Sequence, residues 1–354
     1  MKYIVYLSLI ITTIVSGCNT SLQEPAPILE ITATPPQTSN APETDESVIQ
    51  NQADAPYLDA NLPIDVRVAD LMSRMTLEEK IGQMTQVEKG SITPAEVKLF
   101  AIGSVLSGGG GSPSENSTEA WAKMVDSYQE AALGTRLRIP IIYGVDAVHG
   151  HANLKGATFF PHNIGLGAAA DPELMFRIGQ ATAIEMWATG IPWNFAPVVA
   201  VPQDIRWGRT YEGFSESTEL VSLLAIPYIK GLQSSPKSRN MSSEISTLAT
   251  AKHFIGDGAT VWGASSAVGM GVSYKLDQGD VRMEESQIRQ LLLPPYQAAL
   301  DAGVLSVMVS FNSWNGEKLH GSEYWLNGVL KNELGFEGFV VSDWQGIDQI
   351  SGNY

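Results

Sequence analysis

The regular alternation of apolar, strand-like runs with helical patterns is the feature that most constrains the fold of this chain. The strand-like runs lie at residues 103–106, 139–145, 193–199, 247–254, 304–311 and 339–342. Helices are expected among them at about 118–133, 171–190, 217–232, 284–302 and 323–334. Such alternation predicts a parallel sheet covered by helices, which is either a doubly wound sheet or a (β/α)8 barrel.

Polar, aromatic and glycine residues gather directly after nearly every strand-like run. In a barrel, the residues that carry the chemistry lie at the carboxyl ends of the strands, so this pattern favours the barrel. We therefore expect an α/β fold of the TIM-like (β/α)8 type. Periodicity alone does not prove that the barrel closes.

Three helices have clear boundary signals. Apolar residues at helical spacing predict the first helix, with the stripe Ile64, Val68, Leu71, Met72 and Met75. Thr76 and Glu79 form a capping-box pattern before a second helix, which carries Leu77, Ile81 and Met84. Asp171 as N-cap, Pro172 at the first helical position and Gly190 after the last turn bracket the third.

Residues 1–18 have the pattern of a signal peptide. Lys2 precedes a mostly apolar stretch at 3–15, which is too short to span a bilayer comfortably. Small residues then lead to Cys18, the only cysteine, in a pattern that resembles a bacterial lipobox. We expect export to the bacterial periplasm or cell surface with a lipid anchor at Cys18; an ordinary secretory signal is the alternative. A single cysteine excludes internal disulfides and CxxC sites.

Residues 19–58 are rich in Pro, Thr, Ser, Glu and Asn and predict a disordered linker. The whole chain has 22 Lys and Arg against 38 Asp and Glu, a formal net charge of −16. Such a charge argues against nucleic-acid binding, which needs basic patches, and against electrostatic docking on anionic lipid. We expect contact with a membrane only through the lipid anchor.

Five strand ends offer groups that could bind a sugar. They supply Asp146 and His149; Arg206 and Arg209; Lys252 and His253; Phe311, Asn312 and Trp314; and Asp343 and Trp344. Each has a structural alternative: an aspartate after a strand is often a helix cap, and Arg209 could pair with Glu212 on the surface. Their combination favours sugar binding, which needs polar groups around hydroxyls and an aromatic ring against the sugar face.

Other chemistries have weaker support. His149 and His151 have no HExxH motif and no second carboxylate–histidine cluster beside them, so no metal site is expected. The Gly-Gly-Gly-Gly-Ser segment at 108–112 lacks the ending of a phosphate-binding loop, and no GxSxG motif is present. We expect no cofactor.

The chain resembles the N-terminal barrel domain of family 3 glycoside hydrolases, in the branch of exo-acting β-glucosidases and glucan glucohydrolases. The resemblance covers roughly residues 58–354. Its motifs are DLMSRMTLEEKIGQM, IIYGVDAVHGH, TFFPHNIGLGA, DIRWGRTYEGFSE, AKHFIGDG, VMVSFNSWNG and GFVVSDWQGID.

The resemblance implies a role for several residues. Asp343 matches the catalytic nucleophile, which forms a covalent glycosyl-enzyme and gives retention. Sugar hydroxyls would be bound by Asp146, Arg209, Lys252 and His253. Trp344 matches one face of an aromatic clamp, and Met308 and Phe311 match the pocket wall. The implied substrates are β-linked glucosides or glucan oligosaccharides. Lys252 and Arg209 are expected to lower the pKa of Asp343.

Two departures from the family pattern shape the expectations. The family's general acid/base is a Glu on a second, C-terminal α/β domain, so we expect this group outside the chain and name no residue for it. The last strand and helix of the barrel are also expected to be missing, which makes 59–354 a barrel that is incomplete at its C-terminal end. The chain alone is then expected to bind sugar weakly and to hydrolyse little. The second departure is the segment 261–281, which differs in length and in sequence from the corresponding segment of plant members.

Two alternative functions stay open. Members of the family that are β-N-acetylhexosaminidases carry Pro-Gly-His after Lys-His-Phe, whereas this chain has Ile255-Gly256-Asp257. A non-catalytic glycan-binding lipoprotein is the alternative from another class.

Overall fold

The computed structural model describes residues 55–233, 246–269 and 271–350. The expected signal peptide, Cys18 and most of the expected linker lie outside these residues. The chain divides into two compact units, Met1–Asp70 and Leu71–Tyr354. No helix in the described part of the chain is both long and apolar enough to cross a membrane.

The described part of the first unit is a short turn and the start of a helix. The 3-10 turn η1 (Pro56–Leu58) buries Tyr57, and helix α2 (Ile64–Arg74) begins within this unit. Asp70 accepts a hydrogen bond from the Tyr57 amide at 3.1 Å, and Arg67 donates to the Tyr57 carbonyl at 3.0 Å. The first predicted helix is confirmed, but its apolar stripe is not buried: Ile64 is 73% exposed.

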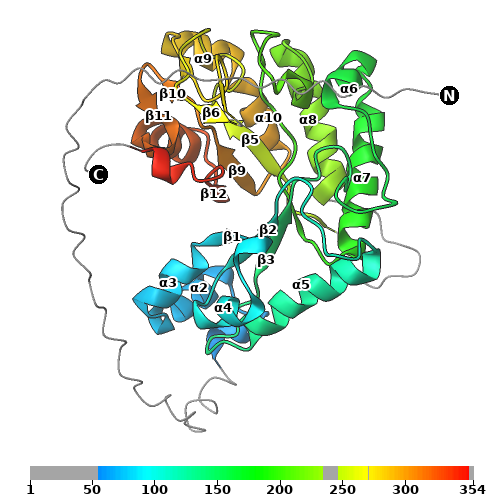
Figure 1. The fold of residues 1–354 in the computed structure, drawn as a ribbon. Coiled ribbons are helices and arrows are strands. Elements are labelled where there is room, and N and C mark those ends of the chain that lie inside the picture. The colour runs from blue at the N-terminus through cyan, green and yellow to red at the C-terminus, as the bar shows by residue number, and fades with distance from the viewer. Residues whose placement is uncertain (1–54, 234–245, 270, 351–354) are drawn as a thin grey trace, which may run out of the picture. The chain divides into compact units, whose positions relative to one another are not determined.

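Parallel strands form the framework of the second unit (Figure 1). Four of them pair in the order β1 (Gln86–Glu88), β2 (Ser104–Ser107), β3 (Ile142–Val145) and β4 (Trp193–Asn194). Three more pair in the order β12 (Phe339–Val341), β9 (Ser306–Val309) and β5 (Thr250–Phe254). Isolated parallel bridges from Trp193 to Leu248 and from Val198 to Lys252 join the two groups. The parallel strands therefore follow one another in chain order, as in a TIM-like (β/α)8 fold.

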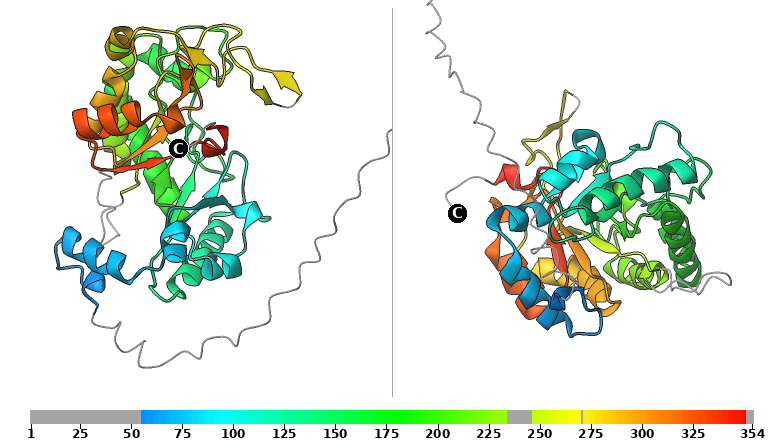
Figure 2. Two further views of the ribbon diagram at one scale, coloured as in Figure 1. Left: turned by 90° about the vertical axis from the view of Figure 1, so that its left-hand side faces the viewer. Right: turned by 90° about the horizontal axis from the view of Figure 1, so that it is seen from below.

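A cluster of side chains between the strands supports the barrel arrangement. Trp193, Phe195 and Met308 are buried together, and they contact the partly buried residues Leu106, Leu248 and Val341. The ring of Trp193 on β4 lies 5.1 Å from that of Phe339 on β12. Residues of both strand groups thus fill one interior, which is the packing expected inside a barrel. Figure 2 shows the same strands from two further directions.

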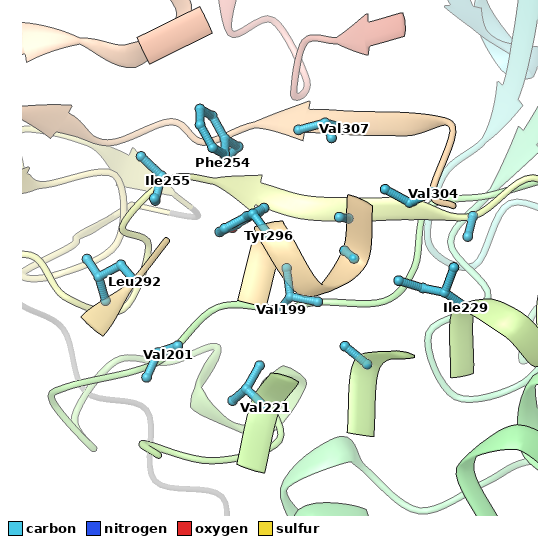
Figure 3. Close-up of a cluster of buried hydrophobic side chains, with 14 of the residues drawn as sticks. Val199, Val201, Val221, Ile229, Phe254, Ile255, Leu292, Tyr296, Val304 and Val307 are labelled. Atoms are coloured by element: carbon cyan, nitrogen blue, oxygen red, sulfur yellow. The ribbon is translucent and has the colours of Figure 1, made fainter. Parts of the chain in front are cut away.

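Helices cover the outside of the strands. The longer ones are α5 (Thr118–Leu133), α7 (Pro172–Ala188), α8 (Thr218–Gln233), α10 (Pro294–Asp301) and the π-helical η5 (Tyr324–Glu333). The largest apolar cluster lies between strands and helices; for example, Val307 of β9 and Phe254 of β5 pack with Tyr296 of α10 and Ile229 of α8 (Figure 3). A second cluster packs β2 and β3 against α5.

Shorter elements complete the second unit. Its remaining helices are α3 (Leu77–Gln83), α4 (Pro94–Leu99), α6 (Asn163–Ala169) and α9 (Glu285–Leu291). Its 3-10 turns are η2 (Lys89–Ser91), η3 (Thr210–Glu212), η4 (Leu319–Gly321) and η6 (Ile347–Gln349). Two-residue strands occur in loops as β6 (Val268–Gly269), β7 (Val272–Ser273), β8 (Asp280–Val281), β10 (Ser313–Trp314) and β11 (Glu317–Lys318).

The predicted helix boundaries hold with one correction. The capping box of Thr76 and Glu79 forms, and Asp171 accepts a hydrogen bond from the Leu174 amide at 3.0 Å. The helix expected over 284–302 is instead two helices, α9 and α10. They separate at Pro294 because proline has no amide hydrogen to continue the helical ladder. Strand β1 was not predicted, since three residues are too few for a readable period.

Candidate active site

The structure gathers five of the predicted site residues where strands end. Asp146 directly follows β3, Lys252 and His253 lie in β5, and Asp343 follows β12. Arg209 precedes the turn η3 in the loop after β4. Contacts described below connect these residues, so the site lies at the carboxyl ends of the strands, as expected.

Asp343 presents one carboxylate oxygen without a partner. Its Oδ1 accepts a hydrogen bond from the Trp344 amide at 2.7 Å, and its own amide donates to Nε2 of His320 at 3.1 Å. Its Oδ2 is buried, has no hydrogen-bond partner within the described residues, and lies 3.7 Å from Nε2 of His253. The backbone around Asp343 is thus fixed while Oδ2 is free to react or to accept a hydrogen bond.

Burial raises the pKa of the Asp343 carboxyl above its ordinary value. The Trp344 amide and the charges of Arg209 and Lys252 act in the opposite direction, and Asp146 adds to the rise. The two cations therefore lower the pKa of Asp343, as the sequence predicted, but burial raises this pKa by more than they lower it. The sequence predicted a lowered pKa for the Asp343 carboxyl, whereas the fold raises it.

Lys252 and Asp146 form an ion pair across the site. Lys252 Nζ lies 2.7 Å from Asp146 Oδ1, and the lysine side chain is 4% exposed against 37% for the aspartate. The pairing of β5 with β9 shifts register between Lys252 and Phe254, and the Lys252–His253 peptide bond is cis. A register shift of this kind re-aims side chains, and here two consecutive residues reach the same site.

Arg209 is held by Glu212 and also reaches His253. Its guanidinium donates to both carboxylate oxygens of Glu212, at 2.7 and 2.8 Å, and its Nη2 lies 3.0 Å from His253 Nε2. Burial opposes the charged form, but Glu212 outweighs it and raises the pKa of Arg209. The pairing with Glu212 considered from the sequence does form, although it lies inside the site rather than on an open surface: the Glu212 side chain is only 13% exposed.

His253 has a buried carboxyl on its other side. Its Nδ1 lies 2.7 Å from Asp257 Oδ2. Burial raises the pKa of Asp257 to about 8 and holds the pKa of His253 well below its ordinary value, with Arg209 and Lys252 adding to the second effect. The imidazole of His253 is therefore neutral near pH 7.

Three residues that complete the site were not among the predicted site residues. Glu212 was considered only as a surface partner of Arg209, and Asp257 follows His253 by four positions, a spacing that could have suggested a local partner. Nothing in the sequence marked His320, which contacts Asp343 from 23 residues away.

The other predicted site residues lie outside the polar cluster. Trp344 is 55% exposed beside Asp343, as a platform for a ligand must be. The half-buried ring of Phe311 lies 5.9 Å from that of His320. Met308 packs in the barrel interior against Trp193 and Phe195. The structure therefore places Met308 with the apolar interior of the barrel.

The two histidines considered as metal ligands, His149 and His151, lie in different surroundings and contact different residues. His151 is fully buried, with its Nε2 3.1 Å from the Thr189 hydroxyl and its ring 5.2 Å from that of Trp121. His149 instead pairs with His162, with 2.9 Å between the ring nitrogens. Across the described ranges, no three His, Cys, Asp or Glu side chains are placed to hold a metal ion.

Comparison with known proteins gives consistent matches. The family model described as "Glycosyl hydrolase family 3 N terminal domain" matches residues 76–354. A lysosomal beta glucosidase of Dictyostelium discoideum is 32% identical over 320 residues, which are 85% of this chain and 37% of that protein. A periplasmic beta-glucosidase of Salmonella typhimurium is 32% identical over 81% of this chain and 34% of that protein. The chain thus spans about a third of these relatives.

Solved structures agree with this match. An exo-1,3/1,4-beta-glucanase from a Pseudoalteromonas species is 43% identical, with a TM-score of 0.72 over 81% of this chain and 35% of that chain. A beta-glucosidase mutant from Listeria innocua, solved in complex with laminaribiose, is 27% identical, with a TM-score of 0.64 over 80% of this chain and 38% of that chain.

Proposed function

The chain belongs to glycosyl hydrolase family 3, and from this membership and its site we propose that it acts in a retaining, exo-acting β-glucosidase. The substrates we propose are terminal β-D-glucosyl residues of β-glucans or cello-oligosaccharides. The names of its relatives support this class, since they include β-glucosidases and an exo-β-glucanase.

The observation that carries the proposal is Oδ2 of Asp343, which is buried and has no hydrogen-bond partner in the part of the chain that the structure describes. In the first step, this oxygen attacks the anomeric carbon, the bond to the leaving group breaks, and a general acid protonates the leaving oxygen. In the second, water attacks the same carbon, its proton goes to the general base, and the Asp343 carboxylate is released. Two displacements at one carbon restore the original configuration, which is retention.

The charged groups beside Asp343 suit the hydroxyls of the same sugar ring. Lys252 and Arg209 donate hydrogen bonds, and Asp146 accepts them, so together they can bind vicinal hydroxyls. Their charges also favour the ionised form of Asp343. Trp344 offers an exposed ring for the next sugar.

We propose no general acid among the described residues. The other carboxyl groups of the cluster are already engaged: Asp146 by Lys252, Glu212 by Arg209 and Asp257 by His253. The proton donor is then a group outside the described residues. Export, with lipid attachment at Cys18, also stays a proposal, supported by the periplasmic relative.

A slow substrate with a good leaving group tests the nucleophile without needing the acid. Dinitrophenyl 2-deoxy-2-fluoro-β-glucoside should add one fluoroglucosyl group to the chain, because dinitrophenolate leaves unprotonated and the fluorine slows release. Peptide mass spectrometry should place the adduct on Asp343, and Asp343→Asn should remove it. An adduct on another residue would refute the assignment. Release of nitrophenol from nitrophenyl N-acetylglucosaminide, compared with release from nitrophenyl glucoside, separates the alternative activity.

A further inference from the structure

His253 lies between three groups, each of which can contact one of its ring nitrogens. Arg209 Nη2 is 3.0 Å from Nε2, Asp343 Oδ2 is 3.7 Å from the same nitrogen, and Asp257 Oδ2 is 2.7 Å from Nδ1. His253 is 2% exposed and Asp257 is 8% exposed, so water has little access to any of these contacts. The position of one proton on this ring therefore has consequences for the whole site.

The neighbours of the ring determine where that proton lies. A guanidinium can only donate hydrogen bonds, so the contact of Nε2 with Arg209 favours an unprotonated Nε2, and the partner of Nδ1 decides whether the ring can adopt that form. A neutral imidazole with an unprotonated Nε2 carries its hydrogen on Nδ1. Nδ1 faces Asp257 Oδ2, which can accept a hydrogen bond whether that carboxyl is charged or neutral.

We propose that Asp257 is a positioning residue, which holds His253 in the Nδ1–H tautomer so that Nε2 stays an acceptor, for Arg209 Nη2 before sugar binds and for a sugar hydroxyl in its place afterwards. This proposal rests on the function proposed above. A hydroxyl both donates and accepts, and the site then offers the acceptor Nε2 next to the donors Arg209 Nη2 and Lys252 Nζ. Such an arrangement favours a sugar that carries a hydroxyl group at this position. A sugar with hydrogen there makes no hydrogen bond, and a sugar with fluorine there cannot donate one.

The same tautomer keeps a hydrogen away from Asp343 Oδ2, which has no hydrogen-bond partner among the described residues. With a hydrogen on Nε2, the imidazole could turn it toward Asp343 Oδ2, 3.7 Å away, and would occupy the lone pair that attacks the sugar. With Nε2 unprotonated, no hydrogen lies between the two atoms. Asp257 thus keeps the nucleophile free through His253, without touching the substrate itself.

Nitrogen NMR of the whole chain, labelled at its histidines, reads the tautomer directly. The chain has five histidines, and His253→Gln identifies the signals of His253 by their loss. We expect an unprotonated, pyridine-type Nε2 and a protonated Nδ1. In Asp257→Leu, which removes the acceptor but keeps an apolar fit, we expect the Nε2–H tautomer to become populated. Asp257→Asn should keep the original tautomer, because its amide oxygen can still accept.

Sugar binding supplies the second measurement. Glucose should bind Asp257→Leu about threefold to tenfold more weakly than the unchanged chain, the worth of one hydrogen bond. Among the four monodeoxyfluoro-glucoses, at least one should bind the unchanged chain worse than glucose, and Asp257→Leu should shrink that difference. Asp301→Leu is the matched control, since Asp301 ends α10, at the opposite end of the strands, and its carboxylate accepts a solvent-exposed hydrogen bond from Gln297.

Each result decides the proposal. A protonated Nε2 in the unchanged chain overturns it, even if no variant folds. A folded Asp257→Leu that keeps both its tautomer and its glucose affinity overturns it as well. If the unchanged chain binds no glucose at all, that result counts against the proposed function, while the tautomer measurement still decides the role of Asp257.

Discussion

Lys252 Nζ and Asp146 Oδ1 lie 2.7 Å apart although 106 positions separate the two residues in the chain. The pair joins the end of β3 to β5 and places a positive charge beside Asp343. The lysine is the buried member and the aspartate the more exposed one, so the two are not equivalent.

This asymmetry predicts different costs for removing each partner. Asp146→Ala leaves a buried ammonium without its partner and should lower the free energy of unfolding by about 2 kcal/mol. Lys252→Met leaves only a carboxylate that water can reach, so its cost should be below about 1 kcal/mol, while glucose affinity falls about tenfold. Urea unfolding and calorimetric titration measure the two quantities. The opposite order of stabilities would contradict the assigned burial.

Trp344 should contribute to the affinity for a disaccharide but not to the stability of the fold. Its side chain is 55% exposed, so Trp344→Ala should change the free energy of unfolding by less than about 0.5 kcal/mol. Loss of an aromatic platform should weaken laminaribiose about fivefold to tenfold and leave glucose nearly unchanged. Trp325→Ala is the contrast, because a fully buried tryptophan should cost about 3–5 kcal/mol. Equal weakening of both sugars would place Trp344 in the first subsite instead.

His151 should make the fold sensitive to acid. Burial lowers the pKa of His151 from 6.5 to about 4 in the folded chain. Between these values the unfolded chain binds a proton that the folded chain does not, so stability is complete above pH 6.5 and falls as the pH drops toward 4. The loss should approach about 1.4 kcal/mol per pH unit.

His151→Gln removes this component. Urea unfolding at several pH values should show that the wild-type chain loses stability more steeply than the variant on acidification. Parallel pH profiles for the two proteins would show that His151 is not held neutral by burial.

Gly144 in β3 tests the packing of the barrel interior. A Cβ at this position would lie 2.3 Å from Cζ of Phe195, so Gly144→Ala should cost about 1–3 kcal/mol. Phe195→Leu shortens the ring that causes the conflict, and the double variant should lose less stability than the sum of the two single changes. Gly108→Ala is the control, since none of the described residues lies within 4 Å of its added Cβ. Additive costs would argue against a direct contact.

The amino-acid sequence is enough to predict the order of strands and helices, since apolar periods and caps such as Asp171–Pro172 are local properties. It also supplied the family motifs, and with them the five polar residues that the structure brings together. It missed β1, and it did not foresee the break at Pro294 between α9 and α10.

How the polar residues act on one another is set by the tertiary structure. It buries Asp343 enough to raise its pKa despite two nearby cations, and it gives Lys252 a distant partner in Asp146. It also places Asp257 behind His253 and His320 against the Asp343 amide. Burial and contacts between distant strands depend on how the whole chain packs, so no local pattern encodes them. The sequence identifies the charged groups. Their protonation states and the directions of their hydrogen bonds depend on the fold.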